Sequence, residues 1–277
     1  MQAMEVVRLS PALGAEIRGV DASRPISSED FRRIENAWHQ HLVILLRGQD
    51  LDEDAQVRFA ERFGPLSPIH TDHHSERNKA VMYIGNRKKD GKIVGALPLG
   101  EMQFHSDQCY TERPAMGTML YAIEIPEEGG NTLFANAYKA YESLPDDVKR
   151  RIDGRRAVQV YDYGGGVLDR KHMVEPQAGL SYAHPVARTH PATGKKALYV
   201  NRLMTHHIEG LPRAESEELL ALMFDTIERP DFIYEHRWRV GDLLLWDNRC
   251  TLHARRDFDP NASRWLRRVT IQGERPA

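Results

Sequence analysis

Few features of this chain are typical of secreted, membrane-spanning or nucleic-acid-binding proteins. Its 277 residues include two cysteines, Cys109 and Cys250, too few for a disulfide-held secreted scaffold, which predicts a reducing compartment. The longest apolar runs, such as 42–46 and 243–246, are far shorter than the roughly 20 residues that a transmembrane helix needs. The N-terminus has no basic stretch followed by an apolar one, so we expect no signal peptide. These absences predict a cytoplasmic protein that does not bind membranes.

The sequence also lacks an excess of either charge. It has 38 Lys and Arg against 40 Asp and Glu, interspersed along the chain. No broad basic face can be drawn from it, so we expect no binding to nucleic acid. The hydrophobic and charged fractions, 41% and 28%, are ordinary for a globular protein, and the length allows a full core. With no repeat, low-complexity tract or linker, we expect one domain over residues 1–277.

Helical patterns are few. Ser27, followed by Asp30, predicts the start of one helix, and Asp52 opens a second that ends at Gly64. Further helices are expected over 136–144, 146–152 and 214–227. Strands are expected over 43–46, 80–85, 116–125, 157–163, 197–200, 232–239, 242–246 and 265–272.

These strands do not alternate regularly with helices, which argues against a doubly wound α/β fold. The pattern favours a mainly β fold with flanking helices, a sandwich or jelly roll. Two weakly patterned stretches, 65–100 and 164–179, are long for passive connections, and we expect them to be loops around an opening.

Three His-x-acid patterns are candidate metal sites, because residues two apart on a strand share a face. They start at His70, His105 and His207. The composition alone gives roughly two such matches by chance, so each could also be a solvated surface pair. Context favours His105 and Asp107, which lead into a predicted strand. His253 follows another apolar strand and could complete a facial triad of two His and one carboxylate, the ligand set of non-haem iron(II) oxygenases.

Several longer motifs in the sequence resemble those of one protein family. They are Phe-His-Ser-Asp at 104–107, Glu-Gly-Gly-Asn-Thr at 128–132, His-Pro-Val at 184–186, Arg-Thr-His-Pro at 188–191 and Gly-Asp-Leu-Leu-Leu-Trp-Asp-Asn-Arg at 241–249. In this order they resemble the TauD/TfdA (taurine dioxygenase) family of Fe(II)/2-oxoglutarate-dependent dioxygenases. The resemblance implies a double-stranded β-helix (jelly roll). It also implies an enzyme that uses Fe(2+), 2-oxoglutarate and O2, and that hydroxylates or oxidatively cleaves a small, anionic carboxylate or sulfonate substrate, releasing succinate and CO2.

The resemblance assigns roles to individual residues. His105, Asp107 and His253 match the iron ligands. Thr132 and Arg264 match the pair that binds the far carboxylate of 2-oxoglutarate, a role suited to a hydroxyl and a planar guanidinium.

The substrate contacts implied are Arg268, which would bind an anionic group, Trp246 beside the iron, His70 and Glu101. Glu101 occupies the position at which taurine-type members of the family carry a residue with an amide side chain. From the residues alone, Trp246 could equally be a core aromatic, and His70 and Glu101 solvated loop residues. We expect Arg267 to be a solvated charge, and Cys109 and Cys250 to be small buried apolar residues.

Two other functions use the same ligands. One is a jelly-roll metal hydrolase or isomerase that holds zinc, which accepts two His and one acid. The other is a non-catalytic metal-binding sensor. The zinc enzyme gives no reason for Thr132 and Arg264 together. A sensor would need neither O2 nor turnover, and release of succinate distinguishes both functions from an oxygenase. Family habit further implies a homo-oligomer, a dimer or tetramer.

Overall fold

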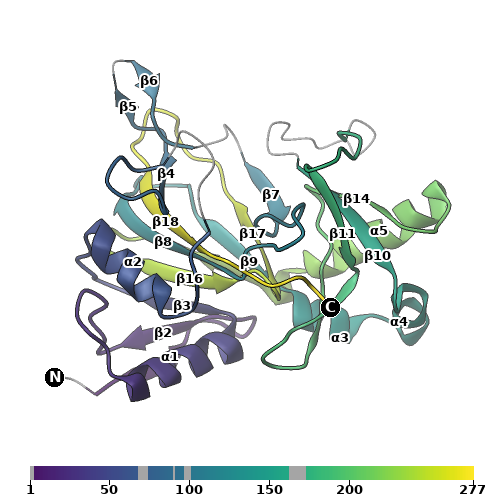
Figure 1. Ribbon diagram of the computed structural model, residues 1–277, viewed down its shortest axis with the longest axis horizontal. Helices are drawn as coiled ribbons and strands as arrows, with labels where there is room; N and C mark the ends of the chain where they lie inside the picture. Colours follow the sequence, from purple (N-terminus) through teal and green to yellow (C-terminus); the bar gives the residue numbers. More distant parts are fainter. Residues whose placement is uncertain (1–2, 68–73, 90, 97–100, 162–172) are drawn as a thin grey trace.

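Two facing β-sheets form the centre of the computed structural model, which describes residues 3–67, 74–89, 91–96, 101–161 and 173–277 (Figure 1). The larger sheet has the strand order β1 (Glu5–Arg8), β2 (Ala15–Arg18), β3 (Val43–Leu46), β16 (Leu243–Asp247), β8 (Gly117–Glu124), β18 (Trp265–Ile271) and β4 (Val81–Gly85). The second has the order β15 (Ile233–His236), β9 (Thr132–Asn136), β17 (Thr251–Arg255) and β7 (Met102–His105). This is the jelly roll expected from the sequence.

Smaller sheets and helices surround this centre. The minor sheets are β11 (Ser181–Pro185), β10 (Arg156–Val160) and β14 (Thr205–Ile208), then β12 (Ala187–Thr189) with β13 (Lys196–Leu198), and β5 (Lys88–Lys89) with β6 (Lys92–Ile93). The helices are α1 (Ser28–His41), α2 (Glu53–Glu61), α3 (Ala137–Ser143), α4 (Asp146–Ile152) and α5 (Arg213–Ile227), with a 3-10 turn at Pro230–Phe232. None of the helices in these described segments is long and apolar enough to cross a membrane.

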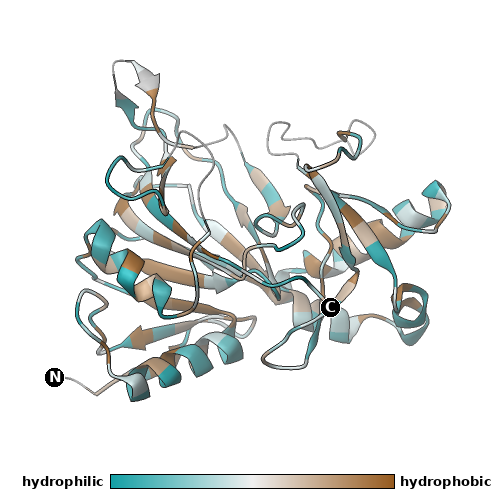
Figure 2. Cartoon of the chain, in the orientation of Figure 1, coloured by the Kyte–Doolittle hydropathy of each residue, from teal (hydrophilic) through white to brown (hydrophobic). Residues whose placement is uncertain are grey.

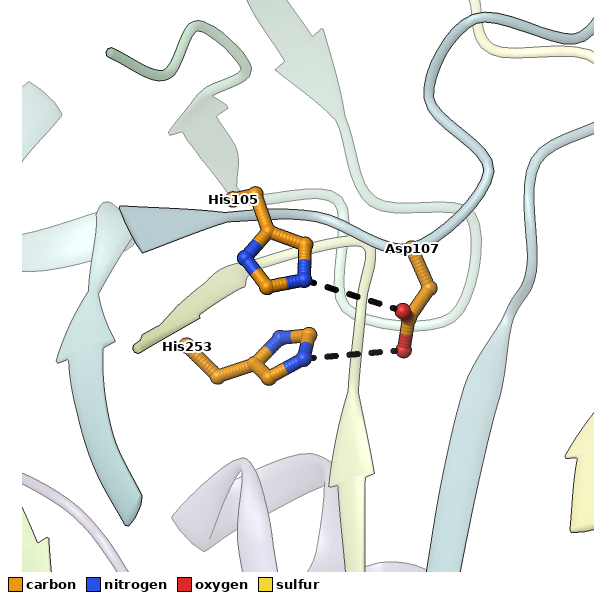
Figure 3. Close-up of side chains that lie close together, drawn as sticks. All are labelled: His105, Asp107 and His253. Atoms are coloured by element: carbon orange, nitrogen blue, oxygen red, sulfur yellow. Dashed lines mark ion pairs between the residues drawn. The ribbon is translucent and has the colours of Figure 1, made fainter. Parts of the chain in front are cut away.

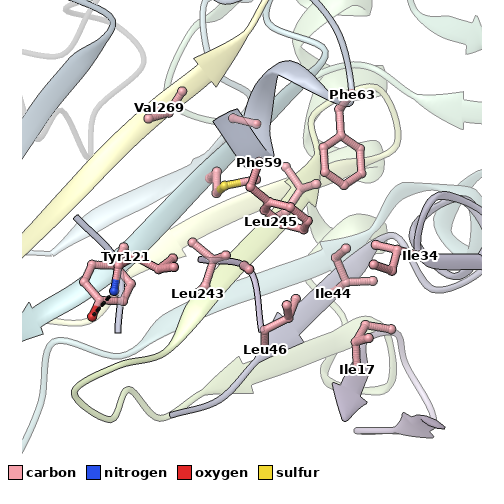
Figure 4. Close-up of a cluster of buried hydrophobic side chains, with 14 of the residues drawn as sticks. Ile17, Ile34, Ile44, Leu46, Phe59, Phe63, Tyr121, Leu243, Leu245 and Val269 are labelled. Atoms are coloured by element: carbon pink, nitrogen blue, oxygen red, sulfur yellow. Dashed lines mark hydrogen bonds between the residues drawn. The ribbon is translucent and has the colours of Figure 1, made fainter. Parts of the chain in front are cut away.

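The apolar side chains form three layers. One cluster lies between α1, α2 and the outer face of the larger sheet, and includes Ile34, Phe59 and Leu245 (Figure 4). A second fills the space between the two main sheets, where Phe134 of β9 meets Trp246 of β16. A third packs α3, α4 and α5 against the second sheet. Figure 2 shows hydrophobic residues along the central strands and a mostly hydrophilic visible side of α1. The second sheet is therefore buried on both faces.

The helix starts follow the predicted chemistry. The Ser27 hydroxyl accepts a hydrogen bond from the backbone N–H of Asp30, and the Asp52 carboxylate accepts one from Ala55. The predicted strands and helices are present with ends shifted by a few residues, except that 232–239 is a 3-10 turn followed by the short strand β15. The expected loop 164–179 lies partly outside the described residues, as does most of the span 65–73.

Two strands that position the site were missed. β9 has five buried residues in succession, and β17 has four of five buried, so neither shows the alternation that marks a half-exposed strand. His253 is thus in the middle of its own strand and not in a segment that follows one. The expected strand through His105 and Asp107 also ends at His105. Asp107 lies in the turn that follows, which aims its carboxylate back toward the two sheets.

Candidate active site

Two histidines from neighbouring strands and Asp107, from the turn after one of these strands, have their side chains close together (Figure 3). His105 and His253 are direct cross-strand partners on β7 and β17. The Nε2 atom of His105 lies 4.0 Å from one carboxylate oxygen of Asp107, and Nε2 of His253 lies 3.8 Å from the other. The three ligand atoms lie within 4.8 Å of one another. The structure therefore brings together the three residues that the sequence indicated.

The two imidazoles are buried, and that of His105 is oriented to bind a cation through Nε2. The Nδ1 atom of His105 lies 2.9 Å from the carbonyl oxygen of Gln103, and its proton can be donated there, which leaves a lone pair on Nε2. Burial, and next the adjacent His105, lower the pKa of His253 to about 3. Burial also lowers the pKa of His105. Each ring is consequently neutral at physiological pH, as a metal ligand must be.

Asp107 is held by a chain of buried hydrogen bonds. The Thr118 hydroxyl donates to Asp107 Oδ2 at 2.7 Å, and the Asn248 side-chain amide donates to the Thr118 oxygen at 2.9 Å. The Trp246 indole N–H donates to the Asn248 amide oxygen at 2.9 Å. Burial alone would raise the pKa of Asp107, but the charge of Arg268 and the hydrogen bond from Thr118 help to lower that pKa well below its ordinary value. The carboxylate is thus ionised and fixed in orientation.

The other oxygen of Asp107, Oδ1, faces Nε2 of His105. Asp107 Oδ1 is buried and, within the described part of the chain, has no aligned hydrogen-bond donor. Nη2 of Arg268 lies 2.9 Å from it, an ion-pair distance. Two neutral imidazoles and one ionised carboxylate fit a divalent metal such as Fe(II), with coordination positions left for other ligands. The residues present therefore suit the iron implied by the resemblance.

A second group of buried polar side chains lies next to the histidines. The Trp238 indole N–H donates to the Thr132 hydroxyl at 3.0 Å, so the Thr132 proton can be given to another acceptor. Arg264 is 2% exposed, and its Nη1 has no hydrogen-bond partner among the residues described. Burial, and next the nearby Arg255, lower the pKa of Arg264 to about 9. A buried guanidinium without a hydrogen-bond partner at one nitrogen is stabilised by a bound anion, and a carboxylate of 2-oxoglutarate would be such an anion.

Gly130 makes room for this arginine. Its backbone has φ of +65°, and a Cβ placed on it would lie 3.1 Å from Nε of Arg264. The Gly130 carbonyl accepts a hydrogen bond of 3.3 Å from the same nitrogen. The positive φ and the close approach of Arg264 thus favour glycine at position 130, whereas at Gly129 a Cβ would lie 2.5 Å from the carbonyl oxygen of Asp257.

The other candidate residues are more varied. Trp246 is buried, with its ring centroid 4.6 Å from that of His253, so it supports the ligand from behind. The Glu101 side chain is 62% exposed and its carboxylate lies 3.5 Å from Arg256. This agrees with the alternative that Glu101 is a solvated loop residue. His70 lies outside the described residues. Arg267, expected to be solvated, is instead 6% exposed and donates to Gln56 at 2.7 Å, because the outer face of β18 is covered by α2.

Another set of potential ligands is already saturated. His190, Asp247 and Cys250 are buried close together. Both Asp247 oxygens are occupied, by the Arg249 guanidinium and by Nε2 of His190 at 2.9 Å. Burial raises the pKa of the Cys250 thiol well above its ordinary value, and that of Cys109 to about 12. Both cysteines are small buried residues, as expected, and the cluster is structural.

Comparisons with known proteins agree with this site. Residues 5–270 match the family described as taurine catabolism dioxygenase TauD, TfdA family. The alpha-ketoglutarate-dependent 2,4-dichlorophenoxyacetate dioxygenase of Burkholderia sp. (strain RASC) is 35% identical, over 96% of this chain and 94% of that protein. The pentalenolactone F synthase of Streptomyces avermitilis is 34% identical, over 100% and 96%.

Similarity of structure points the same way. The crystal structure of AAD-2 in complex with Mn(II) and N-oxalylglycine has a TM-score of 0.83 at 26% identity, covering 99% of each chain. N-oxalylglycine differs from 2-oxoglutarate by an NH in place of one methylene group. These matches leave no support for a zinc hydrolase or a non-catalytic sensor. The chain belongs to the TauD/TfdA family and is an Fe(II)- and 2-oxoglutarate-dependent dioxygenase.

Proposed function

We propose that the enzyme oxidises a small organic anion, a carboxylate or sulfonate, by hydroxylation or by oxidative cleavage, with release of succinate and CO2. The observation that carries the choice of an anion is the place of Arg268. Its side chain is 20% exposed, and its guanidinium lies 2.9 Å from the metal-binding carboxylate. A cation beside the metal, still partly open to solvent, can bind an anionic group and hold the rest of the molecule near the reacting centre.

The proposal divides the site into three parts. His105, Asp107 and His253 hold Fe(II), which when bound supplies the activation of O2 and the oxidising power. Thr132 and Arg264 bind the far carboxylate of 2-oxoglutarate, and so fix its keto-acid end toward the metal. Arg268 orients the substrate anion. The buried walls exclude water from the reacting groups.

The named relatives favour an anionic substrate. The 2,4-dichlorophenoxyacetate of the Burkholderia enzyme is a carboxylate. We retain His70 as a proposed substrate contact on the resemblance, and we propose that Trp246 acts through His253 rather than on substrate. For Glu101, which pairs with Arg256, the solvated role is favoured.

The cofactor assignment is tested by spectroscopy. Under anaerobic conditions, Fe(II) and 2-oxoglutarate should give a visible charge-transfer band in the wild type. Asp107→Ala should abolish it, and Arg264→Ala should require far more 2-oxoglutarate to reach it. Succinate release that depends on O2 is then followed with aryloxyacetates, sulfonates and neutral analogues. Iron binding with no band at saturating 2-oxoglutarate would contradict the assignment.

The role of Arg268 has a separate test. Replacing it by glutamine should raise the KM for an anionic substrate by about 10- to 100-fold, because a charge-assisted hydrogen bond is lost. The concentration of 2-oxoglutarate needed for the band should stay within about twofold of the wild type. Equal loss of both affinities would contradict this division of roles. Since Arg268 also contacts Asp107, iron affinity is measured alongside.

We also propose that residues 1–277 form one catalytic domain, and that the enzyme is a cytoplasmic homo-oligomer. Support for both comes from the family alone. Light scattering after size-exclusion chromatography measures the oligomeric state, and a monomeric mass would contradict it.

A further inference from the structure

We propose that Trp238 is a positioning residue for the cosubstrate: its indole N–H fixes the Thr132 hydroxyl so that the hydroxyl proton points to the far carboxylate of 2-oxoglutarate. This inference rests on the proposed role of Thr132. It adds a residue that acts through Thr132 and that the sequence motifs did not single out.

The chemistry of the two side chains sets the direction of their hydrogen bond. Nε1 of Trp238 lies 3.0 Å from Oγ1 of Thr132, and both residues are buried. An indole nitrogen can only donate, so the Thr132 oxygen accepts and the hydroxyl proton is directed elsewhere. Accepting one hydrogen bond also polarises a buried hydroxyl and makes it a stronger donor. Thr132 is thereby prepared to donate to an anion.

The indole ring of Trp238 is itself held by His236. The two ring centroids lie 4.6 Å apart with the ring planes at 90°, a favourable edge-to-face arrangement. His236 is fully buried, and it is directly opposite Thr132 where β15 pairs with β9. The strand pairing and the ring contact together fix the position of the indole relative to Thr132.

Both ring nitrogens of His236 have partners. Nε2 lies 3.1 Å from Oδ2 of Asp242, and Nδ1 lies 3.0 Å from the Tyr234 hydroxyl oxygen. Asp242 forms an ion pair with Arg47 at 2.8 Å, so its carboxylate accepts, and the single proton of a neutral His236 ring belongs on Nε2. Nδ1 then accepts from the Tyr234 hydroxyl. Burial lowers the pKa of His236, which favours this neutral ring. The network leaves His236 one tautomer and one orientation.

A purely structural role makes different predictions. Trp238 belongs to the apolar cluster between the two main sheets, so packing is the alternative to positioning. Packing alone would make Trp238→Phe lose stability with no change in cosubstrate affinity. Positioning would weaken the binding of ligands that carry the far carboxylate, and only while Thr132 keeps its hydroxyl. Ligand selectivity and dependence on Thr132 therefore separate the two roles.

The experiment uses the full chain loaded with Mn(II), and measures binding by calorimetry. The ligands are 2-oxoglutarate and 2-oxopentanoate, which has the same carbon chain without the far carboxylate. The variants are Trp238→Phe, Thr132→Val and the double variant. The matched control is Trp38→Phe, because Trp38 is 1% exposed and its Nε1 has no hydrogen-bond partner in the part of the chain that the structure describes. The control loses the same volume without losing a hydrogen bond.

In Trp238→Phe, the Kd for 2-oxoglutarate should rise about 5- to 10-fold, the effect of one weakened hydrogen bond. The Kd for 2-oxopentanoate should change less than about twofold. When Thr132 is already valine, the Trp238 substitution should change the Kd for 2-oxoglutarate by less than about twofold, because the two residues act as one unit. Trp38→Phe should bind both ligands as the wild type does.

The wild type offers a second measurement should Trp238→Phe not fold. The chain has four tryptophans, so the indole N–H resonance of Trp238 in the Zn(II)-loaded protein is identified by elimination from variants at the other three. 2-Oxoglutarate should shift this resonance downfield, because a hydroxyl that donates to a carboxylate becomes a better acceptor for the indole. 2-Oxopentanoate should leave it in place.

An unchanged Kd for 2-oxoglutarate in Trp238→Phe, an equal loss for both ligands, or the same loss with and without the Thr132 hydroxyl would overturn the inference while leaving the proposed function intact. A Trp238 resonance that 2-oxoglutarate does not shift would do the same. If Thr132→Val bound 2-oxoglutarate as the wild type does, the role of Thr132 would fall with the inference. No binding of 2-oxoglutarate by the Mn(II)-loaded wild type would overturn the proposed function and this inference together.

Discussion

Replacing Thr118 by valine tests how the fold orients the metal-binding carboxylate. Thr118 is fully buried on β8, donates to Asp107 at 2.7 Å and accepts from Asn248 at 2.9 Å. Valine has nearly the same shape and suits a strand, so the backbone should not change. The variant loses a hydrogen bond to a charged group, worth about 1.5–3 kcal/mol, and leaves the Asn248 amide without its acceptor.

We therefore expect Thr118→Val to lower the free energy of unfolding by about 2–3 kcal/mol. The affinity for Fe(II) should fall by about 10- to 100-fold, the usual effect of removing a residue that orients a metal ligand. Urea unfolding of the metal-free protein measures the first quantity. Quenching of tryptophan fluorescence on anaerobic addition of Fe(II) measures the second.

The control is Thr118→Ser, which keeps the hydroxyl and removes a methyl group. It should lose about 1 kcal/mol of stability from the small cavity but bind iron nearly as the wild type does. If Thr118→Val bound iron with unchanged affinity, the hydrogen-bond chain from Trp246 to Asp107 would be a packing feature without influence on the metal, and the reasoning would be refuted.

Two further changes test other parts of the structure. Burial lowers the pKa of His184 to about 4, below the value of about 6.5 in the unfolded chain. As the pH falls below about 6.5, the unfolded chain therefore takes up a proton that the folded protein does not. The free energy of unfolding is unaffected by this difference above pH 6.5 and decreases as the pH falls toward 4. Urea unfolding at pH 7.5 and pH 5 should show the wild type losing about 2 kcal/mol more than His184→Asn, and equal losses would contradict the buried neutral state. Gly130→Ala should cost about 1–2 kcal/mol through its positive φ and also weaken 2-oxoglutarate binding, because the new Cβ would displace Arg264. Its control, Gly154→Ala, has a similar φ of +67° and open space around it, so it should show the stability loss with normal binding.

The sequence predicted the elements whose signals are local. Ser27 and Asp52 begin helices through hydrogen bonds to residues three positions away, and β3 is a compact apolar run. β9 and β17 were missed because burial on both faces removes their alternation, although they hold Thr132 and His253. Thr132 and His253 were identified only through the long motifs of the family.

The residues that support the site were missed for a different reason. Asn248 and Thr118 are 130 positions apart in sequence, and Trp238 and Thr132 are 106 apart. No spacing rule joins such pairs, since only the closed sheets bring them together. The partners of these threonine, asparagine and tryptophan side chains could be identified only from the three-dimensional structure.

The pairing of β7 with β17 has a consequence for how the enzyme matures. The two strands bring together segments that are far apart, as in the hydrogen bond from Ser106 to Asn248 across 142 positions. Closing so long a loop is slow and occurs only when both sheets have formed. A nascent or partly folded chain therefore offers no complete site, and we expect iron to bind only after the sheets have closed. Until then, Arg268 supplies the positive charge that Asp107 needs, so the fold can form before the metal arrives.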